Sequence, residues 1–255
     1  MPLFKNELPI LEYDTDQNAV FMPEGAAGEP YPETAVMLFM DKEVDDYVEK
    51  NDCKLLDSLN CIPKVIDVWQ TEYQGKKICF CKTPLGGPAA AQMMEMLYAK
   101  GVRRFLASGC CGALVEGTEG EFYIPTAALR QEGTSYQYLP PAREVHTDAQ
   151  VNSAIKKAVE SAGYSCKECK TWTTDALFRE TKEMVNYRRQ EGYVVVDMEC
   201  ASMAACAQMR SAAFGQLLFT ADSLADENKH DTRGWGADTF ATALKLVFDA
   251  ASSLI

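Results

Sequence analysis

The sequence is poor in several residue types, and each shortage excludes a class of function. It holds two histidines among 255 residues, too few for a histidine-rich metal centre. Lys and Arg total 25 against 37 Asp and Glu, a formal net charge of −12, which repels nucleic-acid polymers and anionic membranes. No apolar run approaches the roughly 18 residues of a spanning helix. The N-terminus carries acids where a signal peptide needs an apolar core, so we expect a cytoplasmic protein.

Cysteine, by contrast, is abundant. Most of the ten cysteines lie inside apolar segments such as ICFCK and MECASMAAC, the pattern of small buried side chains in a reducing compartment. Cys166 and Cys169 form a CxxC, and Cys79 and Cys81 a CxC. A structural zinc site needs four ligands in a closed pattern, so we predict no metal.

The order of apolar segments predicts an α/β fold. Short apolar runs alternate with helical patterns after a Pro/Gly-rich segment at 22–33, and fully apolar strands are typical of a sheet covered on both faces. We predict one domain over 1–255 with an irregular segment at 1–33. The expected strands are Thr34–Met40, Lys64–Trp69, Lys77–Lys82, Arg103–Ser108, Glu121–Leu129, Tyr193–Asp197 and Gln216–Thr220, and the expected helices Pro88–Lys100, Asp148–Ala162, Cys200–Ser211 and Ala237–Ser253.

Acidic residues follow two of the most apolar strands. Asp197, Met198 and Glu199 follow YVVV, and Asp222 follows QLLFT. Acids before a helix can be plain caps, but ligands of open α/β sheets bind at the carboxyl ends of strands. A carboxylate there can accept hydrogen bonds from a vicinal diol such as a ribose. Asp222 could be a cap or a general acid, and Arg233, eleven residues later, could pair with it and set its protonation.

Further candidates are weaker one by one. Asp175 and Phe178 offer a polar anchor and an aromatic face for a flat heterocycle, although core packing is the simpler reading of Phe178. Gly109-Cys110-Cys111-Gly112 follows a strand and offers a nest of backbone N–H groups. His146 and His230 look like surface residues.

Taken together, these segments resemble the nucleoside phosphorylase/uridine phosphorylase superfamily. The resemblance runs from about Lys77 to the C-terminus and rests on TPLGGPAAAQMMEML, FLASGCCGAL, GEFYIPTAALRQEGTSYQY, TTDALF, VVVDMECASMAA and LLFTADS, in that order. It implies a three-layer α/β sandwich around a mixed, partly barrelled sheet and a homo-oligomer, dimer or hexamer. It also implies cleavage of the N-glycosidic bond of a nucleoside, with no cofactor and with inorganic phosphate as co-substrate.

The resemblance also implies roles for individual residues. Met198 and Glu199 would lie under the ribose with Asp197 close by, and Phe178 would stack on the base. Asp222 would protonate the base as it leaves, and Arg233 approximately matches the arginine that helps to switch that aspartate.

The sequence departs from the family where phosphate is bound. The Gly-Asp-Pro-x-x-Arg loop after the first strand is replaced by an acidic stretch at 41–46. An arginine that precedes the second glycine nest is replaced by Ala107, and the Ser/Thr ligand of that nest by Cys110. Gly109 and Cys110 would then form the rest of this site. Lys82, Arg130 and Arg179 could substitute for the missing arginines, although a salt bridge is an equally good reading of Arg130.

Three functions therefore compete, and we rank phosphorolysis first. A hydrolytic nucleosidase is second, with Glu24, Glu43 or Asp45 activating the water. A non-catalytic nucleoside-binding protein is third, because binding alone does not need a general acid at Asp222. The general acid favours a purine base slightly, whereas RQEGTSYQY looks more like the uridine-cleaving branch.

Overall fold

The computed structural model describes all residues except 1–2, 62–63 and 227. The strands are β1 (Thr34–Leu38), β2 (Cys53–Cys61), β3 (Lys64–Tyr73), β4 (Lys76–Lys82), β5 (Arg104–Ala113), β6 (Phe122–Gln131), β7 (Glu144–His146), β8 (Cys166–Thr174), β9 (Val195–Asp197) and β10 (Ala213–Ser223). The α-helices are α1 (Lys42–Lys50), α2 (Gly87–Ala99), α3 (Ser135–Tyr138), α4 (Ala149–Ser161), α5 (Lys182–Gln190), α6 (Cys200–Met209) and α7 (Phe240–Ser253). Two 3₁₀ helices, η1 (Pro9–Leu11) and η2 (Leu177–Arg179), complete the set.

The strands form one mixed sheet that is partly closed. Its order is β10-β6-β8-β9-β5-β1-β4-β3-β2, and β10 also pairs with β5. That extra pairing closes β5, β9, β8, β6 and β10 into a five-stranded barrel, from which β1, β4, β3 and β2 extend as an open sheet. The carboxyl ends of the parallel strands β5 and β10 therefore lie side by side.

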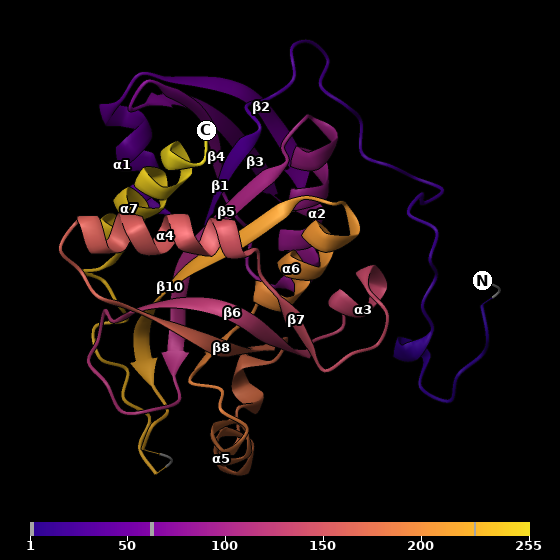
Figure 1. Cartoon of the computed structure of the whole chain (residues 1–255), viewed down its shortest axis with the longest axis vertical. Coiled ribbons are helices and arrows are strands. Elements are labelled where there is room, and N and C mark those ends of the chain that lie inside the picture. The colour runs from indigo at the N-terminus through magenta and orange to yellow at the C-terminus, as the bar shows by residue number, and fades with distance from the viewer. Residues whose placement is uncertain (1–2, 62–63, 227) are drawn as a thin grey trace.

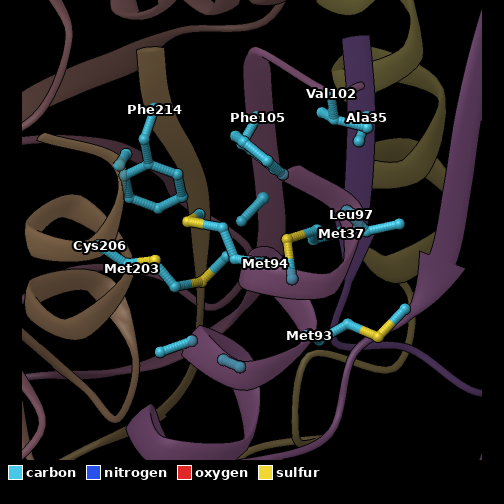
Figure 2. Close-up of a cluster of buried hydrophobic side chains, with 14 of the residues drawn as sticks. Ala35, Met37, Met93, Met94, Leu97, Val102, Phe105, Met203, Cys206 and Phe214 are labelled. Carbon is cyan, nitrogen blue, oxygen red and sulfur yellow. The ribbon is translucent and has the colours of Figure 1, made fainter. Parts of the chain in front are cut away.

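Helices cover both faces of the sheet, as Figure 1 shows. On one face α2 and α6 pack against β5 and β10, and Figure 2 shows the sulfur-rich core between the helices and the sheet, where Met94 and Met203 lie on the side of Phe214. On the other face α4 and α7 cover a second core. Burying one such side chain stabilises a fold by about 1.5–3 kcal/mol, so the two cores hold the barrel rigidly between layers. The predicted three-layer sandwich around a mixed, partly barrelled sheet is confirmed.

The apolar strands and the four helices are found close to their predicted bounds. The sequence pattern did not predict the strands that carry many polar residues. β2 and β8 carry alternating polar residues, so they show no apolar run. The prediction of a backbone nest at Gly109–Gly112 was wrong. These residues continue β5, paired with Leu218–Asp222 of β10, so their backbone is extended and does not form a turn.

Residues 3–33 run along the side of the molecule beside α3 with η1 as their one regular element. The ten cysteines are all free thiols, and the residues described contain no cluster of His, Cys, Asp and Glu able to hold a metal ion. None of the helices in the described ranges has the length and apolar character needed to cross a bilayer.

Candidate functional site

Asp197 is a buried carboxyl group that joins three elements around the candidate site. Its Oδ1 accepts hydrogen bonds from Thr171 Oγ1 at 2.9 Å and Thr173 Oγ1 at 2.8 Å, both on β8. Its Oδ2 accepts the backbone N–H groups of Glu199 at 2.9 Å and Cys200 at 2.6 Å. Burial raises the pKa of Asp197 in spite of these donors. With 4% of the residue exposed, Asp197 ties β8 and β9 to the start of α6 and so fixes the position of Glu199.

Replacing Asp197 by Asn tests whether these hydrogen bonds stabilise the fold. The amide oxygen can keep the two backbone donors while the NH₂ group faces the threonine hydroxyls, so we expect a loss of about 1–2 kcal/mol in unfolding free energy. Urea denaturation of the variant measures this loss. Replacing the exposed Asp175 by Asn is the control. An Asp197→Asn variant as stable as the wild type would contradict the joining role of Asp197.

Glu199 is the buried carboxyl group at the end of β9. It is 6% exposed, and its Oε1 accepts the backbone N–H of Gly86 at 2.8 Å, at the start of α2. Burial, with the charge of Asp197 second, raises the pKa of Glu199 to about 8. The preceding Met198 is half-buried. A positive charge placed beside Glu199 would therefore stabilise its ionised form.

Asp222 ends β10 and pairs with a histidine. His230 Nε2 lies 2.7 Å from Asp222 Oδ2, and the Asp222 side chain is 13% exposed. Glu180, which follows η2, lies close enough that burial and the charge of Asp222 raise its pKa to about 7. The expected pairing of Arg233 with Asp222 is not present. Arg233 instead donates to Gly117 O at 2.8 Å and lies 3.8 Å from Asp231 Oδ2.

Cys110 of β5 is close enough to both Glu199 and Asp222 to feel their charges. Desolvation and the charges of these two carboxyl groups raise the pKa of its thiol to about 11, and the residue is exposed. The neighbouring Gly112 leaves no room for a side chain, since a Cβ there would lie 2.9 Å from Val196 Cγ1 and 3.4 Å from Asp222 Oδ1. The strands β9 and β10 both pair with β5 in this region, Val196 with Gly112 and Asp222 with Gly112, so the chain segments that carry Glu199 and Asp222 both adjoin the end of β5.

The expected phosphate side of this site is filled by an aromatic ring. A Cβ on Gly109 would lie 2.8 Å from Phe39 Cβ and 3.2 Å from Phe39 Cδ2, so the Phe39 ring packs directly on Gly109. Phe39 follows β1, where the resemblance places a glycine-rich phosphate loop. Apolar carbon therefore stands beside the strand segment that carries Cys110.

The acidic stretch after β1 is held by Lys82. Lys82 Nζ lies 2.6 Å from Asp41 Oδ1 and 2.8 Å from Asp45 Oδ2. A lysine neutralised by two carboxylates is a poor anion ligand, because any phosphate would have to displace both.

The two arginines predicted as alternative phosphate ligands, Arg130 and Arg179, differ in burial. Arg130 is buried and donates to Ser135 Oγ and to the carbonyl oxygens of Ser135, Leu139 and Pro140 at 2.7–3.0 Å. These bonds hold the α3 turn and favour a structural role. Arg179, in η2, is exposed.

The two residues expected at the base lie after β8. Asp175 Oδ2 accepts the backbone N–H of Gly133 at 2.9 Å, which joins the end of β8 to the end of β6. Phe178, in the η2 turn that follows, is 96% exposed. Its ring is therefore not packed in the core, which was the simpler interpretation of the sequence.

Sequence reasoning missed three residues of this site. His230 lies in an irregular loop, Glu180 follows a short turn, and Phe39 sits at the end of an apolar strand. The acidic stretch at 41–46, in place of the family's phosphate loop, was a signal that this region is altered, but it did not point to Phe39.

Comparison with known proteins places these features in a family. The family model described as "Phosphorylase superfamily" matches residues 33–252. A guanosine phosphorylase of Halorubrum lacusprofundi is 29% identical over 146 residues, covering 57% of this chain and 61% of that protein. A uridine phosphorylase of Thermococcus kodakarensis is 32% identical over 133 residues, covering 46% and 48%, and that of Escherichia coli is 29% identical over 111 residues, covering 43% and 44%. These matches span less than two thirds of the relatives' length.

A solved structure adds a likeness in fold. The AMP nucleosidase of Bacteroides thetaiotaomicron superimposes with a TM-score of 0.71 at 20% identity, over 88% of this chain and 89% of that one. The family match covers most of the chain and includes β1 to α7. The chain therefore belongs to the phosphorylase superfamily.

Proposed function

We propose that the protein cleaves the N-glycosidic bond of a nucleoside and that water is the acceptor. The observation that carries the proposal is that the charges of Glu199 and Asp222 both act on Cys110, at the end of β5 where β9 and β10 pair with it. One carboxyl group is placed for the sugar and the other for the base. A non-catalytic binding protein would have no use for the second.

The two groups fit the charges that the reaction develops. As the bond breaks, the sugar becomes cation-like and the base takes the electron pair. The Glu199 carboxylate, held by Gly86 N–H, stabilises the cation and accepts hydrogen bonds from the ribose hydroxyl groups. Asp222 gives a proton to the leaving base. Met198 supports the sugar ring, and Phe178 covers the base.

The surroundings of Cys110 support water over phosphate. Phe39 packs on Gly109, and Lys82 is taken by Asp41 and Asp45. A phosphate dianion bound here would meet an aromatic ring and carboxylates instead of charge-assisted donors. A water molecule needs no cationic clamp.

Glu43 is the carboxylate that we assign to activating this water. It lies in the first turn of α1 and lines a cavity of about 1120 Å³ together with Phe39, Lys82 and the loop Thr83–Leu85. The next residue of that loop, Gly86, donates its backbone N–H to Glu199, so one loop both lines the cavity and positions Glu199. Within the described part of the chain Glu43 forms no hydrogen bond or ion pair, which leaves it able to take a proton from water.

Product analysis tests this function. Inosine, guanosine, adenosine and uridine are each incubated with the protein, with and without phosphate, and products are separated by chromatography. We expect free base and free ribose at rates independent of phosphate, with the purine nucleosides cleaved faster. Base release that requires phosphate and yields ribose 1-phosphate would instead establish the second candidate, phosphorolysis, which the names of the curated relatives favour. Binding without any cleavage would contradict both.

Glu43→Gln tests the water-activating role. We expect turnover of the best nucleoside to fall by about 100-fold, because general-base catalysis is typically worth 10²–10⁴-fold. Glu49→Gln is the matched control, since Glu49 lines the same cavity from the last turn of α1. Equal effects of the two substitutions would remove Glu43 from this role.

A further inference from the structure

The loop after β10 holds a histidine against Asp222. The chain leaves β10 at Ser223, turns, and returns so that Ser223 N donates to Asp231 O at 2.8 Å and Asp231 N to Ser223 O at 3.1 Å. His230 directly precedes this bridge, as Asp222 directly precedes its partner. The two side chains are thus brought together by paired backbone, and their 2.7 Å contact is not a chance meeting of long surface side chains.

Several ionisable groups share this corner. Cys110 of β5 and Glu180, which follows η2, are both close enough to feel the charge of Asp222. On its other side His230 meets the Trp235 ring edge-on, with centroids 5.9 Å apart. Among Cys110, Glu180 and His230, His230 is the group that can carry a positive charge, when both ring nitrogens hold a proton.

The contact can hold one proton in either of two arrangements. An imidazolium donates from Nε2 to the Asp222 carboxylate, or a protonated Asp222 donates to a neutral imidazole. The His230 side chain is 47% exposed, against 13% for Asp222. Solvent therefore reaches the histidine more readily than the aspartate.

We propose that His230 positions Asp222 and resupplies it with the proton that the leaving base takes, an inference that rests on the proposed function. As the C1′–N bond breaks, its electron pair leaves with the base, and the Asp222 carboxyl proton forms the new N–H bond. Water adds to C1′ and gives its second proton to Glu43, which returns it to solvent. Nε2 then returns a proton to Asp222, and the imidazole takes another from solvent.

His230→Gln separates this role from a structural one. Glutamine can keep a hydrogen bond to Asp222 but cannot titrate. We expect nucleoside turnover to fall about 10–100-fold, because glutamine cannot return a proton to Asp222. Added imidazole is expected to restore part of the lost rate. His146→Gln, which changes the other histidine, is expected to leave turnover unchanged.

A second substrate shows whether the variant is folded and whether the loss concerns proton transfer. The leaving group of 4-nitrophenyl β-D-ribofuranoside departs without a proton, so His230→Gln is expected to keep the wild-type rate on it. Equal loss on both substrates at all pH values, or unchanged nucleoside turnover, would overturn this inference about His230 and leave the proposed function standing. If the wild type released neither base nor nitrophenolate, the proposed function would fail as well.

Discussion

Asp222→Asn is expected to lower the turnover of nucleosides by 10²–10⁴-fold and to spare a substrate that needs no proton. Asparagine is nearly isosteric and can keep the contact with His230 Nε2, but its amide cannot give a proton to the base. The loss is therefore expected in kcat, with the dissociation constant of a nucleoside changed little. Turnover of 4-nitrophenyl β-D-ribofuranoside should stay near the wild-type rate. Full nucleoside turnover in the variant would remove Asp222 from the acid role.

Glu199→Gln is expected to lower the turnover of both substrates by 10²–10³-fold, because the cation forms on the sugar whichever group leaves. The two variants are therefore expected to behave differently. Asp222→Asn lowers turnover only of the substrate whose leaving group needs a proton, whereas Glu199→Gln lowers turnover of both substrates. Glu183→Gln, which removes the same charge at an exposed position of α5, controls for altered charge. A Glu199 variant that fails on nucleosides alone would place this residue at the base instead of the sugar.

The same substitution is expected to stabilise the free protein at alkaline pH. The pKa of Glu199 is raised to about 8 in the folded chain, whereas an unfolded chain ionises such a group near pH 4.5. Stability is therefore full below about pH 4.5, falls as pH rises, and reaches its lower level above about pH 8. Glutamine mimics the neutral form and escapes this loss. Urea denaturation should show little difference at pH 4.5 and a gain of about 1–3 kcal/mol at pH 9. No gain at pH 9 would contradict the buried, unpaired character of Glu199.

Much of the frame is visible in the sequence because burial leaves an apolar signature. YVVVD and QLLFT become β9 and β10, buried almost throughout, and their terminal acids reach the site. Edge and barrel strands such as β2 and β8 leave no such signature, since one side of each is polar.

The partners of the acids depend on contacts that no local pattern encodes. Arg233 and His230 lie at similar distances from Asp222 along the chain. The Ser223–Asp231 bridge brings His230 to Asp222, while Arg233 has the backbone angle φ of +46° and turns toward Gly117. Likewise, the missing phosphate loop was visible as a departure from the family, but the ring of Phe39 on Gly109 follows only from how β1 and β5 pack.

The most direct test is a crystal structure of the Asp222→Asn variant soaked with a nucleoside that it cannot cleave rapidly. The account predicts the ribose hydroxyl groups within hydrogen-bond distance of Glu199, the ring resting on Met198, and a base nitrogen facing residue 222 beside Cys110. A nucleoside bound elsewhere, or with its base at Glu199 and its sugar remote from both carboxyl groups, would contradict it.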